Sequence, residues 1–418
     1  MKKLILSIIT LIMLLAFTSC KNHKETVTPE QLCFDIQRIQ IDLAYSSMKD
    51  MYDPAPYEQL KKDVMEGKLS RVDCVFELKK ILSSYHVMHL NLSQIETEAS
   101  DKMFMPFVFS SFDDGYHVFR ADKKYEKYLG WKLKEFSGYS VEEARDKLLS
   151  FVSYETPSGA KRLFEQSYNY NQLKYAGLLD KKGRVKLCLE SPDGKTEEIS
   201  CSLISSSKAK FINIWPEKGM KYHPYCLNAN YGILSCEEKR TLYIPYKSTY
   251  GIPDYPVTAL ISDILSEIKT GLYDTVVFDI RYNGGGLPRE AIVFRHLFYD
   301  NREEFKKCNL AVVTGGWTYS AACWFLNDFI DVFPEAVIFG EETGQAVFNY
   351  TSVMPYELKY LKCNFIFPQA IDDNPVLKAR AKDIYRDTMP DVEVTENFED
   401  FMNGEDTIYK TIYDYFNK

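Results

Sequence analysis

The chain has 418 residues and a formal net charge of −8, from 51 lysines and arginines against 59 aspartates and glutamates. This length predicts two or three domains. Because acidic residues outnumber basic ones, the chain has no excess of positive charge with which to bind phosphate backbones, and we expect no nucleic-acid partner. A hydrophobic fraction of 45%, with 4 tryptophans, 30 tyrosines and 26 phenylalanines, excludes a mainly disordered chain.

The N-terminal segment resembles an export signal. Two lysines precede an uncharged apolar run, residues 4–17, that is too short to span a bilayer comfortably. Small residues then lead to Cys20, as in a bacterial lipoprotein signal, which implies that residues 1–19 are removed and Cys20 is acylated. Residues 20–28 would be a polar tether. The alternative is an ordinary secretory signal cut near Ser19. We expect a protein of the cell envelope, anchored to the membrane by its lipid and facing the periplasm or the outer membrane.

The ten cysteines show none of the paired close spacings that zinc sites use. Most lie within apolar runs, where a thiol packs as a small hydrophobic side chain. We therefore expect no metal site and propose no disulfide framework.

Three domains follow the tether. Residues 29–98 show apolar residues mostly at three- and four-residue steps, which predicts a small helical domain. Residues 103–205 combine short strand-like runs, turns and a helical stretch at 141–151, which predicts an α+β module. In residues 225–418, continuous apolar strands alternate with amphipathic helices, which predicts βαβ units and a sheet covered on both faces. The fold class is multi-domain α/β.

The chemistry should lie in three loops beyond the carboxyl ends of the strands in the last domain. The first is glycine-rich, residues 281–288, and its unshielded amides precede a helix N-terminus that favours negative charge. The second, 315–322, places Ser320 at a strand-to-helix turn, with the Ala321 amide available to an oxyanion. The third, 340–345, is polar. Taken singly, the first loop also fits a plain tight turn, and Ser320 also fits a helix cap.

Together the three loops resemble the S41 family of serine peptidases, which includes the tail-specific C-terminal processing proteases, the tricorn core and the retinoid-binding modules. The motifs are Asp279–Gly286, Thr318–Ala322 and Gly340–Gly344, in that order. The segment 389–394 resembles the closing strand of the family, and 129–144 resembles part of a reduced PDZ-like module. The resemblance implies a ClpP/crotonase-like βαβ core at 225–418 and a PDZ-like module at 103–205.

By this resemblance Ser320 matches the nucleophile, and the amides of Ala321 and of the loop Gly284–Gly286, chiefly Gly285, match the oxyanion hole. A serine hydroxyl needs a base to take its proton. The tail-specific branch uses a lysine in the third loop, but no lysine occurs between residues 340 and 358. A serine–lysine dyad is therefore not expected.

The tricorn-like branch takes its base from a histidine at the end of the helical domain. His86 stands in that place, with His89 as the alternative. An imidazole accepts a proton readily near neutral pH and needs an orienting acid. We name Glu341 for that role, although spacing does not choose among the possible carboxylates, which are Glu341, Glu342, Asp383 and Asp387. Asp279 and Arg281 are expected to fix the glycine loop.

The resulting expectation is an exported, lipid-anchored serine endopeptidase that cleaves peptide or protein substrates by acyl transfer without a cofactor. The alternative is a catalytically inactive lipoprotein of S41 fold that binds peptides or hydrophobic ligands. The sequence leaves the oligomeric state open.

Overall fold

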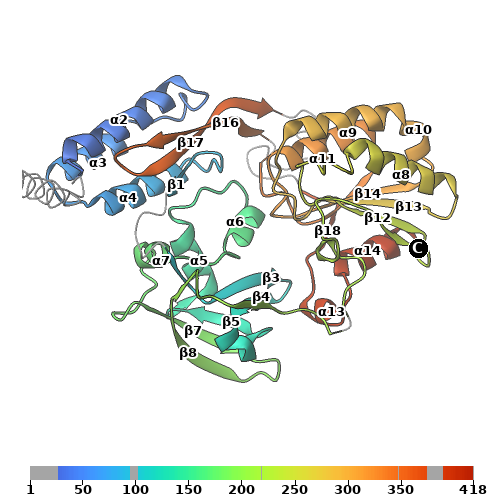
Figure 1. Ribbon diagram of the computed structural model, residues 1–418, viewed down its shortest axis with the longest axis horizontal. Helices are drawn as coiled ribbons and strands as arrows, with labels where there is room; N and C mark the ends of the chain where they lie inside the picture. Colours follow the sequence, from blue (N-terminus) through green and yellow to red (C-terminus); the bar gives the residue numbers. More distant parts are fainter. Residues whose placement is uncertain (1–26, 95–101, 218, 347, 374–388, 418) are drawn as a thin grey trace, which may run out of the picture.

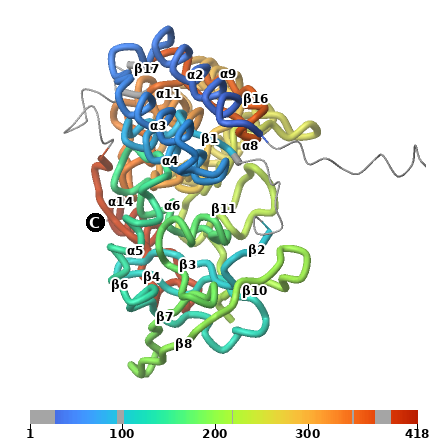
Figure 2. The backbone as a smooth tube through the Cα atoms, turned by 90° about the vertical axis from the view of Figure 1, so that its left-hand side faces the viewer, coloured from blue at the N-terminus to red at the C-terminus, as the bar shows by residue number. Residues whose placement is uncertain are grey.

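The computed structural model describes residues 27–94, 102–217, 219–346, 348–373 and 389–417. Figures 1 and 2 both show an N-terminal helical part at one end, a β-rich module at the other and an α/β core beside them. Each part has its own buried apolar cluster. The proposed export signal and Cys20 lie outside the described residues. Across the described ranges, no helix is both long and apolar enough to cross a membrane.

The helical part consists of α2 (Pro29–Tyr45), α3 (Ala55–Met65) and α4 (Arg71–Ser83). Two of these helices begin at capping boxes: the Thr28 hydroxyl accepts from the Gln31 amide, and the Ser70 hydroxyl accepts from the Asp73 amide. The predicted helical character of this region is confirmed, with breaks at residues 46–54 and 66–70. A short strand, β1 (Asn91–Gln94), follows α4.

A long hairpin, β16 (Phe348–Leu358) and β17 (Cys363–Asp373), joins the helical part to the core. Strand β17 pairs antiparallel with β1, and apolar side chains of the hairpin enter the cluster formed by α2, α3 and α4. Figure 1 shows β16 and β17 reaching across to the helices. A segment from the last predicted domain thus completes the core of the first.

The module from residue 103 to 213 is built on an antiparallel seven-stranded sheet with the order β10–β4–β5–β7–β8, in which β3 pairs with β4 and β6 with β5. Helix α5 begins at a capping box on Ser140. The elements are β2 (Met103–Phe104), β3 (Phe107–Phe112), β4 (Gly115–Asp122), η2 (Lys123–Tyr128), β5 (Lys132–Phe136), β6 (Tyr139–Ser140), α5 (Val141–Leu149), α6 (Pro157–Leu163), α7 (Tyr170–Tyr175), β7 (Arg184–Glu190), β8 (Thr196–Ser202), β9 (Ile204–Ser205) and β10 (Phe211–Asn213).

The core contains a six-stranded sheet with the order β11–β12–β13–β14–β15–β18, parallel from β12 to β18. Helices α8, α9 and α11 cover one face and α14 packs on the other, so both faces are buried. The predicted alternation of strands and helices in βαβ units is confirmed. The elements are η3 (Pro224–Cys226), β11 (Leu234–Cys236), β12 (Thr241–Pro245), α8 (Val257–Lys269), β13 (Thr275–Asp279), α9 (Pro288–Asp300), α10 (Arg302–Phe305), β14 (Asn309–Thr314), α11 (Ala321–Val332), β15 (Val337–Gly340), β18 (Val392–Glu393), α13 (Phe398–Met402) and α14 (Thr407–Phe416).

Candidate active site

The three loops predicted to hold the chemistry lie side by side at the carboxyl ends of β13, β14 and β15. The Tyr319 amide donates to the Asn283 carbonyl at 3.0 Å, which joins the second loop to the first. The Gly344 amide donates to the Thr318 carbonyl at 3.0 Å, which joins the third loop to the second. Parallel neighbouring strands bring their loops to one edge, so residues scattered over 65 positions meet there.

Ser320 occupies a strained turn between β14 and α11. Its backbone has φ 57° and ψ −125°, a conformation that L side chains rarely adopt and that costs about 1–3 kcal/mol. The residue is half-buried, and its hydroxyl has no hydrogen-bond partner among the described residues. The following amide, that of Ala321, likewise has no acceptor there and stands at the N-terminus of α11. A strained serine at a strand-to-helix turn, followed by a helix N-terminal amide with no acceptor among the described residues, has the geometry of a nucleophile elbow.

Gln345 holds the backbone of this turn. Its side-chain oxygen accepts a hydrogen bond from the Ser320 amide at 2.6 Å, and Gln345 itself is buried. Gln345 is in the third loop, in the stretch where the tail-specific branch carries its lysine. No sequence pattern predicts this contact, because a glutamine in a polar loop has many possible partners.

Gly285 lies directly against Ser320. A Cβ atom on Gly285 would stand 2.7 Å from the Ser320 Cβ and 2.9 Å from the Ala321 amide nitrogen, and its φ of 90° also favours glycine. The Gly285 amide donates to the Asn283 side-chain oxygen at 2.9 Å. The fold therefore brings the predicted oxyanion residues together. The Ala321 amide has no acceptor among the described residues, whereas the Gly285 amide donates to Asn283 within its own loop.

The two candidate histidines occupy different surroundings. His86 is exposed at the turn after α4, with φ 53°, and its ring packs edge-on against Tyr154 with centroids 5.4 Å apart. His89 is half-buried, and its ring lies 4.9 Å from that of Tyr319, the residue before Ser320. Its Nδ1 lies 2.7 Å from the Tyr350 carbonyl oxygen on β16. Because a carbonyl only accepts, Nδ1 carries the proton and Nε2 has the lone pair.

Desolvation lowers the pKa of His89, and the hydrogen bond to Tyr350 opposes that shift only in part. The imidazole is therefore neutral near pH 7, the form that a general base needs. Among the described residues, neither His86 nor His89 is hydrogen-bonded to the Ser320 hydroxyl. The assignment of His86 as base stays a prediction.

Glu155 connects the histidine segment to the third loop, a role for which the sequence offered no signal. One oxygen of its carboxylate accepts from the Met88 amide at 3.1 Å, and the other accepts from the Ala346 amide at 3.0 Å. Desolvation raises the pKa of Glu155 to about 7, against the effect of these two hydrogen bonds. One carboxyl group thus fixes the residue before His89 and the residue after Gln345.

The carboxylates considered for orienting the imidazole have other partners or lie outside the described residues. The buried Glu341 pairs with Lys161 at 2.7 Å and Arg162 at 2.8 Å, both on α6. Burial alone would raise the pKa of Glu341, but these two cations lower it to about 2. Glu342 accepts from the Ser158 amide at 2.6 Å. Glu341 and Glu342 thus contact the module, and Asp383 and Asp387 lie outside the described residues.

Asp279 and Arg281 form a buried ionic network beneath the glycine loop, in line with their predicted supporting role. Arg281 contacts Asp279 at 2.6 Å, Glu396 at 3.1 Å and Asp406 at 2.8 Å. His223, Glu396 and Asp406 also place ligand atoms within 4.8 Å of one another, which is close enough for a metal ion. Because the Arg281 guanidinium already supplies positive charge to both carboxylates, we assign this group to structure.

Solved structures of known proteins share the fold of this chain. Mature CPAF matches over 92% of this chain and 96% of its own, at 11% identity and a TM-score of 0.61. Mature CPAF complexed with lactacystin matches over 93% and 97%, at 11% identity and a TM-score of 0.59. The chain has an S41 protease fold.

The predicted fold class, a multi-domain α/β protein, is thereby confirmed. A photosystem II D1 C-terminal processing protease also matches, over 87% of this chain and 92% of its own, at 13% identity and a TM-score of 0.38. No protein-family model matches the sequence, and a search of curated proteins finds no match.

Proposed function

We propose that this chain is an S41-type serine endopeptidase, exported and anchored to a membrane by a lipid on Cys20. The observation that carries the peptidase proposal is the turn before α11, where a strained serine, an amide with no acceptor in the described part of the chain and a closely packed glycine meet. The likeness to the fold of mature CPAF supports it.

In the proposed reaction, Ser320 Oγ attacks the carbonyl carbon of a peptide bond while its proton passes to an imidazole nitrogen. The tetrahedral oxyanion accepts a hydrogen bond from the Ala321 amide, at the positive end of α11. The Gly285 amide becomes the second donor when it exchanges Asn283 for the oxyanion. The imidazolium then protonates the leaving amine, and water hydrolyses the acyl-enzyme by the same route.

The base in this proposal is one of two imidazoles. The S41 resemblance favours His86, with Glu341 as the predicted orienting acid. The contacts favour His89, which packs on Tyr319 and has its proton fixed on Nδ1 by the Tyr350 carbonyl. The pairing of Glu341 with Arg162 and Lys161 gives no support to Glu341 as the orienting group.

A fluorophosphonate probe, which reacts with activated serines, tests the nucleophile. We expect the wild type to be labelled and the Ser320→Ala variant not to be labelled. Ser352→Ala is a matched control, because Ser352 also has a positive φ, of 58°, but lies on β16. Absence of labelling in the folded wild type, or undiminished labelling of Ser320→Ala, contradicts the proposal.

The same probe separates the two imidazoles. Loss of the true base should slow labelling about 10²–10⁴-fold, and loss of the other should leave it nearly unchanged. If His89 is the base, the labelling rate should stay at its plateau down to below pH 6.5, because desolvation lowers the pKa of His89. Retention of the full rate in both His86→Ala and His89→Ala would exclude a histidine base.

The lipid anchor is proposed from the sequence alone. Incorporation of radiolabelled palmitate should disappear in Cys20→Ala, and retention of the label in that variant would refute acylation at Cys20.

A second candidate function is a binding lipoprotein of the same fold without catalysis. Two observations favour it: the Ser320 hydroxyl has no partner among the described residues, and Gln345 lies in the stretch where the tail-specific branch has a lysine. A folded wild type that binds peptides and resists the fluorophosphonate would support this candidate.

A further inference from the structure

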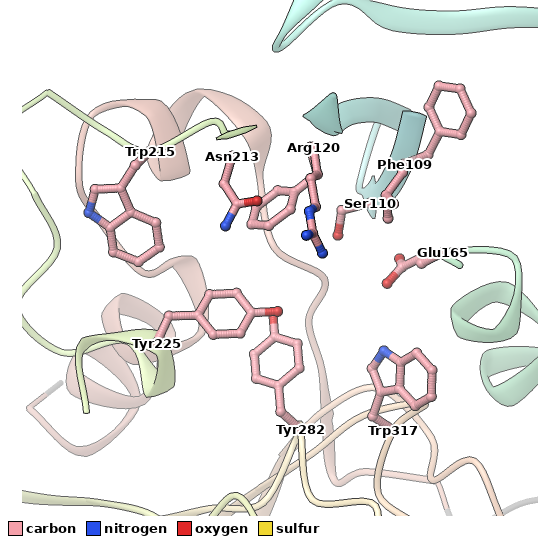
Figure 3. A pocket seen from close by; sticks show the side chains of 11 residues that line it. Phe109, Ser110, Arg120, Glu165, Asn213, Trp215, Tyr225, Tyr282 and Trp317 are labelled. Atoms are coloured by element: carbon pink, nitrogen blue, oxygen red, sulfur yellow. The ribbon is translucent and has the colours of Figure 1, made fainter. Parts of the chain in front are cut away.

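A cavity of about 630 Å³ opens between the module and the core, close to the loops of the candidate active site. Figure 3 shows Trp215 and Tyr225 on one side, Trp317 and Glu165 on the other, and Arg120 pointing between them. Its volume falls in the range of sites that bind small molecules and side chains, and its lining of aromatic rings with few polar groups is typical of such sites.

The cavity adjoins the reaction because two of its walls belong to the active-site loops. Trp317 precedes Ser320 by three residues, and Tyr282 precedes Gly285 by three residues. Tyr282 is held in place by its hydroxyl, which donates to Glu396 at 2.9 Å, and by Tyr225, whose ring stacks on it at 4.8 Å. Two residues of the cavity wall therefore belong to the same loops as Ser320 and Gly285.

The charges in the lining differ in how they are balanced. Glu165 accepts from Arg162 at 2.9 Å and from the Ser111 amide and hydroxyl, so its charge is compensated inside the protein. Arg120 is exposed and lies over the Phe211 ring at 4.5 Å, and it forms no ion pair with a carboxylate of the described residues. The cavity therefore presents one uncompensated cation among aromatic rings.

We propose that this cavity is a substrate subsite that binds a carboxylate of the peptide through Arg120 and an adjacent aromatic side chain among Trp215, Tyr225, Tyr282 and Trp317. The inference rests on the proposed function and adds a substrate class, peptides with an acidic group beside an aromatic residue. A guanidinium pairs with a carboxylate through two parallel hydrogen bonds, and rings pack on rings, so the two recognition elements act together.

Binding is measured on the Ser320→Ala protein, so that catalysis plays no part. The probes are acetylated, amidated octapeptides that differ at one dipeptide: Glu-Phe, Gln-Phe, Lys-Phe and Glu-Ala. A Gln-Phe peptide that ends in a free carboxylate after Phe distinguishes a terminal from a side-chain carboxylate. Quenching of Trp215 and Trp317 reports occupancy, and Trp317→Phe should reduce that signal.

We expect Glu-Phe to bind about fivefold to tenfold more tightly than Gln-Phe, with the difference shrinking as salt is added. Glu-Ala should also bind more weakly than Glu-Phe. Charge reversal is the sharper test: Arg120→Glu should invert the order, so that Lys-Phe binds best. Lys195→Glu is the control, since Lys195 is an exposed cation on the β7–β8 turn and the same charge change there should leave the order unaltered.

Equal binding of Glu-Phe and Gln-Phe, or an order unaffected by Arg120→Glu, overturns the inference. Preference for the peptide with the terminal carboxylate over Glu-Phe supports the carboxylate site and assigns it to a chain end. Failure of the inference is distinct from failure of the proposed function, because fluorophosphonate labelling of wild-type Ser320 is independent of these peptides.

Discussion

Glu155 is the residue whose position most directly links the two halves of the candidate site. Its carboxyl bridges the Met88 and Ala346 amides, which come from segments 258 positions apart. Gln345, next to Ala346, holds the Ser320 amide, and His89, next to Met88, packs on Tyr319. Glu155 therefore acts on both the serine and the histidine through their neighbours.

Glu155 should give the folding stability a distinct pH dependence. Its pKa rises from 4.5 to about 7 on folding, so between these values the folded state holds a proton that the unfolded state has lost. The contribution of Glu155 to stability is therefore fully present below pH 4.5 and is lost as the pH rises through 7, by about 3 kcal/mol.

The comparison is the free energy of unfolding of the wild type and of Glu155→Gln at pH 5 and pH 8. Because glutamine does not titrate, the variant should gain up to about 3 kcal/mol relative to the wild type across this interval. Groups other than Glu155 titrate in both proteins, so their contributions to the difference in unfolding free energy cancel. A difference between the two proteins that is the same at both pH values would contradict this account.

At the scale of elements, the glycine loop after β13 is fitted to the turn before α11. A methyl group on Gly285 would meet Ser320 and the Ala321 amide at distances that atoms do not adopt, whereas a methyl group on Gly284 meets nothing within 4 Å. The two neighbouring glycines thus form a matched pair for substitution.

Gly285→Ala should lower the rate of fluorophosphonate labelling by at least about 10²-fold, because the added methyl group displaces the loop, and with it the Gly285 amide, from Ser320. Gly284→Ala should keep nearly the full rate. Thermal unfolding of both variants shows whether each is folded. Labelling of folded Gly285→Ala at the wild-type rate would mean that this loop is not part of the reaction site.

At the scale of the whole molecule, a buried ionic cluster couples the module to the core. Arg162 on α6 contacts Glu165 at 2.9 Å within the module and Glu341 at 2.8 Å in the third loop. Nearby, the Thr156 hydroxyl donates to the Thr343 carbonyl at 2.8 Å. The module is therefore packed against the active-site loops by specific contacts.

Removing Arg162 should be much more damaging than removing Lys161. Arg162→Met leaves two buried carboxylates without their shared cation, which should cost about 3–5 kcal/mol, whereas Lys161 is partly exposed and Lys161→Met should cost about 1 kcal/mol or less. Urea denaturation of both variants at pH 7 measures the difference. If both variants lost the same unfolding free energy, the buried Arg162 would not be the residue that holds the cluster together.

Much of the architecture was predictable from local patterns. Apolar periodicity located the helices and strands of the core, since a strand or helix depends on residues close together in sequence. The order of the strands then implied that loops 281–288, 315–322 and 340–345 meet at one edge. Ser320 and Ala321 followed from the second loop and Gly285 from the resemblance to the S41 family, and the structure places the three side by side.

What the sequence by itself determined is the set of elements, the order of the loops and the residue types that they carry. Only the tertiary structure decided the partners: Gln345 on the Ser320 amide, Glu155 between Met88 and Ala346, Glu341 with Arg162 on α6, and β17 beside β1. These pairs join segments that are 25 to more than 270 positions apart. A carboxylate or amide has the same chemistry wherever it stands, so its partner is chosen by how whole domains pack, which no local pattern encodes.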